Sequence, residues 1–85
     1  MICILCVDDN RDVLQALAEV LRNSGYATLS APSGERALRL LVQSNTVDLV
    51  VLDYEMPEMR GDHVAQEIRR CKPRLPNHSI YRHTR

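Results

Sequence analysis

Two short apolar runs each end abruptly in carboxylates, and this feature most constrains the fold. Residues 2–7 read Ile-Cys-Ile-Leu-Cys-Val and are followed by Asp8 and Asp9, while residues 47–52 read Val-Asp-Leu-Val-Val-Leu and are followed by Asp53. Neither run alternates apolar with polar residues, as a strand with one solvated face does. Both runs therefore predict β-strands that are covered on both faces, which is typical of parallel sheets.

The segment after the first run has the spacing of an amphipathic helix. Apolar residues recur there at intervals of three and four, at Val13, Leu14, Leu17, Val20 and Leu21. We expect these positions to form one buried helical face. Asn10 is a suitable N-cap, because its side-chain oxygen can accept hydrogen bonds from unpaired backbone N–H groups, and Gly25 is a typical helix-ending residue.

Two further strand and helix units follow. Residues 26–30 form a weaker strand candidate, and a break at residues 32–34, Pro-Ser-Gly, precedes the second helix. The inward residues predicted for this helix are Ala37, Leu38, Leu41 and Val42. After residues 47–52, a third helix is expected to be capped by Asp62, to reach about Cys71 and to stop before Pro73. Its predicted inward residues are Val64, Ala65 and Ile68.

This alternation of strands and helices predicts an α/β fold with a doubly wound parallel sheet. Right-handed crossovers place helices on both faces of such a sheet. We expect the flavodoxin-like strand order 2-1-3-4-5, in which the first and third strands are neighbours. Only three strand–helix units are evident, so we expect an incomplete sheet with a remnant after the third unit.

The length of 85 residues, with 45% hydrophobic and 26% charged residues, indicates one globular domain. We place a partial domain at residues 1–76 and an irregular basic tail at residues 77–85, because the polar residues of this tail do not fit a strand covered on both faces. Charge is unevenly divided: residues 1–67 hold five basic and eleven acidic residues, a net charge of −6, and residues 68–85 hold six basic and no acidic residues.

The remaining composition points to a reducing compartment. No stretch of about 18 apolar residues could span a bilayer and no secretory segment is evident, so we expect a cytoplasmic protein without membrane contact. Cys3, Cys6 and Cys71 are odd in number and indicate reduced, packed thiols. A zinc or redox pair of Cys3 with Cys6 is disfavoured, since residues three apart on a strand point to opposite faces.

The carboxylates that follow the two apolar runs are expected to meet. The carboxyl ends of neighbouring parallel strands share one edge of the sheet, where ligands bind, so Asp8, Asp9 and Asp53 should converge there. Clustered like charges persist where a cation neutralises them, and hard oxygen ligands favour Mg²⁺. Beside Mg²⁺, an oxygen of Asp53 can attack phosphorus and hold an aspartyl phosphate. Taken singly, each residue is also explained as a helix-start acid or a strand end.

These residues resemble the receiver domain of two-component response regulators. The resemblance rests on Asp8-Asp9 and on residues 53–61, Asp-Tyr-Glu-Met-Pro-Glu-Met-Arg-Gly. It implies that Asp53 is the phosphoacceptor, that Asp8, Asp9 and Asp53 hold Mg²⁺, and that the backbone carbonyl of Glu55 is a further metal ligand. It also implies a sensor histidine kinase or phosphotransfer protein as the partner, and a role as a signalling phosphoprotein rather than a turnover enzyme.

The chain departs from the family pattern after its third helix. The family has a Ser or Thr after a fourth strand and a Lys after a fifth, and neither position is matched, because Lys72, the only lysine, precedes any fourth strand. We therefore expect a truncated receiver with impaired phosphorylation, since the loss of one electrostatic partner slows comparable reactions by about 10²–10³. An output domain is expected to be either missing or attached to this domain. Uncovered apolar surface favours self-association.

Two other functions are compatible with the sequence. A non-phosphorylated interaction module would keep only the receiver surface; the unmatched Ser or Thr and Lys favour it, whereas the intact Asp8, Asp9 and Asp53 favour the phosphoacceptor. Direct binding to nucleic-acid phosphates would use the basic residues near the C-terminus, Arg69, Arg70, Lys72, Arg74, Arg82 and Arg85. We do not expect such binding, because Tyr81 is the only aromatic residue among them and no nucleic-acid-binding fold is recognisable.

Overall fold

Strands and helices alternate along the chain as the sequence predicts. The computed structural model describes residues 1–44, 46–53, 61–72, 74 and 77–80, with the backbone alone for residues 53, 61–65 and 77–80. The elements are β1 (Cys3–Val7), α1 (Arg11–Asn23), β2 (Ala27–Ala31), α2 (Gly34–Gln43), β3 (Leu49–Asp53), α3 (Gly61–Cys71) and β4 (Asn77–Ile80). None of the helices in these ranges is long and apolar enough to cross a membrane.

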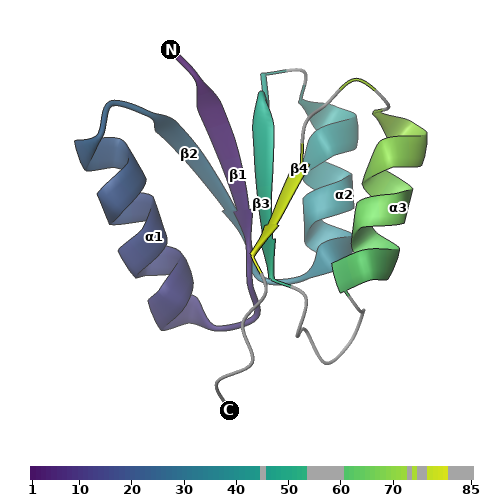
Figure 1. The fold of residues 1–85 in the computed structure, drawn as a ribbon, viewed down its shortest axis with the longest axis horizontal. Helices are drawn as coiled ribbons and strands as arrows, with labels where there is room; N and C mark the ends of the chain where they lie inside the picture. The colour runs from purple at the N-terminus through teal and green to yellow at the C-terminus, as the bar shows by residue number, and fades with distance from the viewer. Residues whose placement is uncertain (45, 54–60, 73, 75–76, 81–85) are drawn as a thin grey trace.

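The strands form one parallel sheet in the order β2-β1-β3-β4. α1 lies on one side of this sheet, and α2 and α3 lie together on the other (Figure 1). The order agrees with the predicted flavodoxin-like arrangement through four strands, and it makes β1 and β3 neighbours. Val7 of β1 is the register partner of Ala31 in β2 and of Leu52 in β3, so the carboxyl ends of these strands reach one edge.

β4 corrects the prediction of an irregular tail at residues 77–85. Asn77–Ile80 pair in parallel with β3, from Asn77 opposite Val50 to Ile80 opposite Asp53, so the predicted tail contains a strand of the sheet. The strand forms despite its polar residues because its pairing with β3 uses backbone N–H and C=O groups, which each of these residues has. Residues 81–85 lie outside the described residues.

The helix ends confirm one predicted cap and correct another. Asn10 caps α1, and its Oδ1 accepts hydrogen bonds from the backbone N–H groups of Asp12 (2.9 Å) and Val13 (3.2 Å). These bonds satisfy donors that have no partner within the helix. Gly25, just beyond α1, has a φ of +96°, a conformation that glycine adopts without strain. α3 already includes Asp62, so the prediction that this residue caps the helix is wrong.

The sheet separates two apolar clusters. The larger cluster lies on the side of α2 and α3 and consists of Leu5, Val7, Ala31, Ala37, Leu41, Val50, Leu52 and Ile68. The smaller cluster lies on the side of α1 and consists of Ile4, Cys6 and Leu14. Because alternate strand residues face opposite sides of a sheet, β1 contributes to both clusters. The prediction that the first apolar run is covered on both faces is therefore confirmed.

The prediction of an inward, buried side chain is wrong for two residues. Val20 of α1 is 61% exposed and Val42 of α2 is 73% exposed. Each helix carries an apolar stripe that is wider than the part of the sheet that it covers. Ile68 of α3 is buried as predicted, while the side chains of Val64 and Ala65 lie outside the described part of the chain.

The cysteines are free, as the sequence predicts, but they are not all packed. Cys6 is buried, Cys3 is half-buried and Cys71 is exposed, so the prediction of a packed thiol is wrong for Cys71. Burial raises the pKa of the Cys6 thiol to about 11, and the neighbouring Cys3 adds to this effect, because both disfavour the charged thiolate. Cys6 therefore remains protonated at neutral pH.

Candidate functional site

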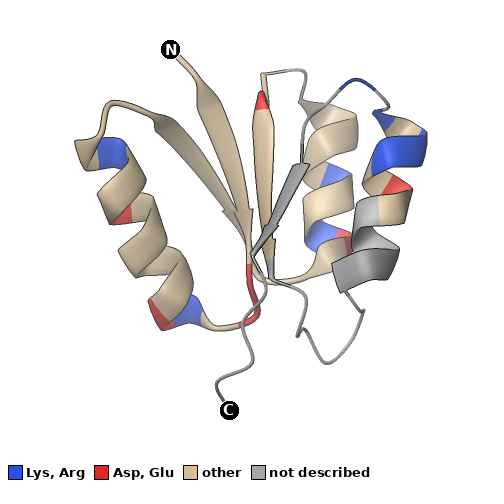
Figure 2. Cartoon of the chain, viewed as in Figure 1, with Lys and Arg blue, Asp and Glu red and all other residues tan. Residues whose placement is uncertain are grey.

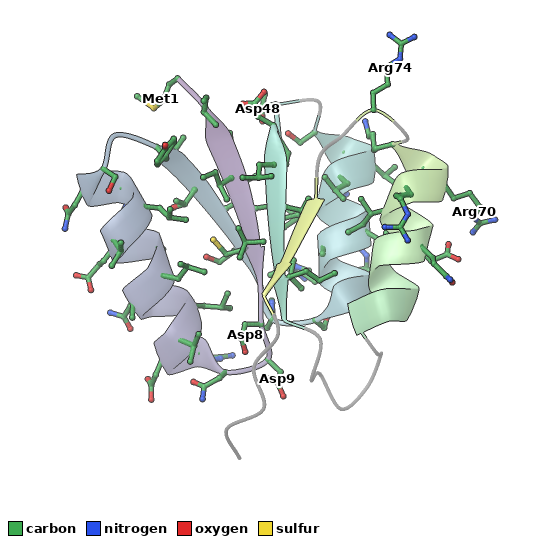
Figure 3. All side chains as sticks on the ribbon, viewed as in Figure 1. Met1, Asp8, Asp9, Asp48, Arg70 and Arg74 are labelled. Carbon is green, nitrogen blue, oxygen red and sulfur yellow. The ribbon has the colours of Figure 1, made fainter. Side chains whose placement is uncertain are left out.

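The carboxyl ends of β1 and β3 bring two of the predicted site positions to one edge of the sheet. Val7 and Leu52 are register partners, and Asp8 and Asp53 are the residues that follow them in the sequence. Asp53 is the last residue of β3. Asp8 and Asp9 lie where β1 gives way to the turn before α1, at the end of the sheet opposite Asp48 (Figure 3). The backbones of Asp8 and Asp53 therefore lie at the same edge of the sheet.

Asp8 is the one charged or polar residue that is buried among the described side chains, with 5% of its surface exposed. Its Oδ1 accepts a hydrogen bond from the backbone N–H of Asn10 (2.9 Å). Its own N–H donates to the carbonyl of Ala31 at the end of β2 (3.2 Å). The Asp8 carboxylate is thus held by the start of α1, and the Asp8 backbone is held by the end of β2. A buried carboxylate needs such a donor or a nearby cation.

Asp9 adds a second carboxylate directly before the cap of α1. Its Oδ1 is buried, and its side chain as a whole is partly exposed. The positive end of the α1 dipole stabilises negative charge at this position. Asp8 and Asp9 together supply hard carboxylate oxygens at the strand edge, and oxygen donors of this kind match the preference of Mg²⁺.

The complete set of predicted metal ligands extends beyond the described side chains. Among those side chains, no group of three or more His, Cys, Asp or Glu residues could hold a metal ion. The predicted trio needs the side chain of Asp53, for which the structure describes the backbone, and Glu55 lies outside the described residues. The meeting of all four ligands, Asp8, Asp9, Asp53 and the Glu55 carbonyl, therefore stays a prediction.

Asp48 has a structural role that the sequence reasoning missed. Its Oδ2 accepts a hydrogen bond from the backbone N–H of Cys3 (2.8 Å), and its own N–H donates to the Cys3 carbonyl (2.8 Å). These two bonds join the start of β1 to the residue before β3, at the edge opposite Asp8 (Figure 3). The available signal was a lone carboxylate that interrupts an apolar run.

Charge is distributed unevenly on the described surface. Acidic residues mark the turn after β1 and the first turn of α1, at Asp8, Asp9 and Asp12, whereas basic residues gather near the end of α3 (Figure 2). Arg70 is paired with Glu67, and this contact raises the pKa of the Arg70 guanidinium. Among the described side chains, carboxylates therefore gather at the strand edge that carries Asp8 and Asp9, and negative charge there attracts a cation.

Comparison with known proteins identifies one family. The chain matches the family model of the response regulator receiver domain over residues 4–83. It is 36% identical over 73 residues to the response regulator SaeR of Staphylococcus aureus strain USA300, an alignment that covers 86% of this chain and 31% of that protein. The chain thus spans about a third of the length of this curated relative.

Solved structures give the same result. The response regulator protein TrrA from Thermotoga maritima, in complex with Mg²⁺ and BeF, has 41% identity and a TM-score of 0.84, over 95% of this chain and 68% of that one. A complex of the histidine kinase ThkA with TrrA matches with 38% identity and a TM-score of 0.91, over 100% of this chain and 72% of the matched chain. The chemotaxis protein CheY4 from Vibrio cholerae has 25% identity and a TM-score of 0.91, over 100% and 72% of the two chains. The flavodoxin-like α/β fold is confirmed.

Proposed function

Since this chain belongs to the family of response regulator receiver domains, we propose that it is the phosphoacceptor of a two-component phosphorelay and that Asp53 is the phosphorylated residue. The observation that carries this proposal is the position of Asp53 at the end of β3, directly beyond the register pair of Leu52 with Val7. Asp8 and Asp9 follow Val7 at the same edge. Neighbouring strands therefore supply a nucleophile and two further carboxylates.

In the proposed step, a carboxylate oxygen of Asp53 attacks the phosphorus of a phosphohistidine on the partner. A P–O bond forms and the P–N bond breaks, and the electron pair of the broken bond stays on the imidazole nitrogen, which takes up a proton from solvent. The product on this chain is an acyl phosphate. Phosphoryl transfer depends mainly on positioning and electrostatics, which is consistent with a site made of few residues.

Asp8, Asp9 and Asp53, with the backbone carbonyl of Glu55, would hold Mg²⁺ at this edge. When bound, Mg²⁺ supplies positive charge that offsets the phosphoryl oxygens and the clustered carboxylates. Asp8 contributes a carboxylate that accepts a hydrogen bond from the Asn10 N–H, and its backbone N–H donates to the end of β2. The complex of the similar protein TrrA with Mg²⁺ and BeF supports this assignment.

We propose a sensor histidine kinase or a phosphotransfer protein as the partner. Support comes from the structure of the histidine kinase ThkA in complex with TrrA, in which the matched chain is 38% identical to this one. The chain then acts as a phosphoacceptor that assists its own modification, and not as a turnover enzyme.

The test is incubation with acetyl phosphate and Mg²⁺, followed by intact-mass spectrometry. We expect one phosphoryl adduct that requires Mg²⁺, is released by hydroxylamine as an acyl phosphate is, and is absent from Asp53→Asn. The matched control is Asp12→Asn, which removes an exposed carboxylate in the first turn of α1 near the same edge and should keep the adduct. If the native chain is folded by circular dichroism and takes up no phosphoryl group, the non-phosphorylated interaction module is the correct function.

A further inference from the structure

Asn10 lies at the junction between the carboxyl end of β1 and the start of α1. The backbone of this junction is tied at both ends. The Asp8 N–H donates to the Ala31 carbonyl of β2 (3.2 Å), and the Leu14 N–H donates to the Asn10 carbonyl (3.1 Å). The Asn10 carbonyl therefore accepts the first hydrogen bond of α1, and the backbone between these two bonds carries both Asp8 and Asp9.

Asn10 makes hydrogen bonds toward the helix and toward Asp8. Its side-chain Oδ1 accepts hydrogen bonds from the backbone N–H groups of Asp12 (2.9 Å) and Val13 (3.2 Å). Its own backbone N–H donates to Oδ1 of Asp8 (2.9 Å). The side-chain bonds hold Asn10 in the extended conformation of a cap, with a φ of −94° and a ψ of 114°. This conformation fixes the backbone whose N–H reaches Asp8.

The carboxylate of Asp8 depends on this hydrogen bond because it is largely withdrawn from water. Asp8 is 5% exposed, so few water molecules can replace a lost donor. A carboxylate buried in this way requires hydrogen-bond donors or a cation. Donors that hold a ligating carboxylate also set its orientation toward the metal ion, and their removal typically weakens metal binding by about 10–100-fold.

We propose that Asn10 is a positioning residue of the Mg²⁺ site: its side-chain cap fixes the backbone of residue 10, whose N–H orients the Asp8 carboxylate. This role rests on the proposed function, in which Asp8 is a ligand of Mg²⁺. Contact between Asn10 and the ion is not required, since the effect passes through Asp8. The alternative is that Asn10 only stabilises α1, as Ser33 stabilises α2 with an Oγ that accepts a hydrogen bond from the Arg36 N–H (3.2 Å).

The two explanations predict different Mg²⁺ affinities. A titration of the 85-residue chain with MgCl₂, followed through its backbone amide NMR signals, measures this affinity without any phosphorylation. We expect Asn10→Ala to raise the Kd for Mg²⁺ by about tenfold, because the donor to the Asp8 carboxylate is no longer held in place. Asn10→Ser keeps an oxygen that can cap α1 and should have a Kd near that of the native chain.

The matched control is Ser33→Ala. It removes the side-chain cap of α2 and therefore costs helix stability in the same way as Asn10→Ala. It leaves the hydrogen bonds of Asn10 in place, so the Kd for Mg²⁺ should not change. Hydrogen exchange without Mg²⁺ is a second readout: the backbone amide at position 10 should exchange faster in Asn10→Ala than in the native chain, and at the native rate in Ser33→Ala.

Three results overturn the proposal. The first is an Asn10→Ala chain with the native Kd for Mg²⁺, and the second is a Ser33→Ala chain whose Kd rises as much as that of Asn10→Ala. In either case, a phosphoryl adduct on Asp53 in the acetyl phosphate assay leaves the proposed function intact. The third is a native chain whose amides at residues 8–10 do not shift with Mg²⁺, which overturns the proposed metal site as well.

Circular dichroism melts establish that each variant is folded. If Asn10→Ala is not, Asn10→Gly takes its place, because glycine also lacks the capping oxygen but weakens the start of a helix less than alanine does. The same rise of about tenfold in the Kd for Mg²⁺ is expected for Asn10→Gly, and a native Kd in this variant overturns the proposal.

Discussion

Replacing Asp48 with alanine should weaken the pairing of β1 with β3 at the ends of these strands that lie opposite the proposed site. The substitution removes the acceptor Oδ2 for the Cys3 N–H (2.8 Å) and keeps the backbone bond from the Asp48 N–H to the Cys3 carbonyl (2.8 Å). β1 and β3 stay paired from this end up to Val7 and Leu52 at the other edge. Asp48 therefore stabilises the strand arrangement that positions Asp8 and Asp53.

The expected size of this effect follows from the exposure of the hydrogen bond. A hydrogen bond to a charged group contributes about 1.5–3 kcal/mol of net stability. Asp48 is exposed, and water can replace the lost acceptor, so we expect the loss to lie near the lower limit, at about 1.5 kcal/mol. For a domain of this size, 1 kcal/mol corresponds to about 4–8 °C in Tm. Asp48→Ala should therefore lower Tm by roughly 6–12 °C.

The assay is urea and thermal unfolding followed by circular dichroism. Asp48→Asn keeps an acceptor oxygen and should lose less than half as much stability as Asp48→Ala. Glu19→Ala removes an exposed carboxylate from α1 and should change the free energy of unfolding by at most about 0.5 kcal/mol. Hydrogen exchange at the Cys3 amide should accelerate in Asp48→Ala. The reasoning is refuted if Asp48→Ala and Glu19→Ala have the same stability, or if exchange at Cys3 is unchanged.

Two further predictions concern the core. Leu5→Ala, at a position with 0% exposure in the larger cluster, should lower the free energy of unfolding by about 3–4 kcal/mol; a loss below about 1 kcal/mol in urea titrations would contradict close packing there. The fold raises the pKa of Cys6 from 9.0 to about 11. Between these pH values the unfolded chain binds fewer protons than the folded chain, so stability should fall as pH rises from about 9 through about 11. Urea titrations should show a shallower decline for Cys6→Ala, and an equal decline would exclude Cys6 as its cause.

Several features of the site were predictable because they depend on short-range patterns. The spacing of apolar residues distinguishes strands from helices, and Asn10 has the side chain that a helix cap requires. Once the first and third runs are neighbouring parallel strands, their carboxyl ends must share an edge. The common location of Asp8 and Asp53 follows from that topology without knowledge of side-chain packing.

Other features depended on neighbours that the local pattern does not identify. The polar composition of Asn77–Ile80 argued against a strand, but its backbone pairs with β3, because strand pairing uses backbone N–H and C=O groups that the side-chain pattern does not report. The position of Asp48 within an apolar run did not reveal its bond to Cys3, because that bond joins residues 45 positions apart in the sequence.

The amino-acid sequence alone determined the order of the elements from β1 to α3, the parallel sheet and the edge that carries Asp8, Asp9 and the end of β3, since backbone preferences and chain connectivity specify these features. Only the tertiary structure decided which apolar residues are covered. Helical periodicity assigns Val20 and Val42 to the same stripes as buried leucines, yet they are 61% and 73% exposed. Burial depends on the width of sheet that each helix actually contacts, and that width is a property of the assembled chain.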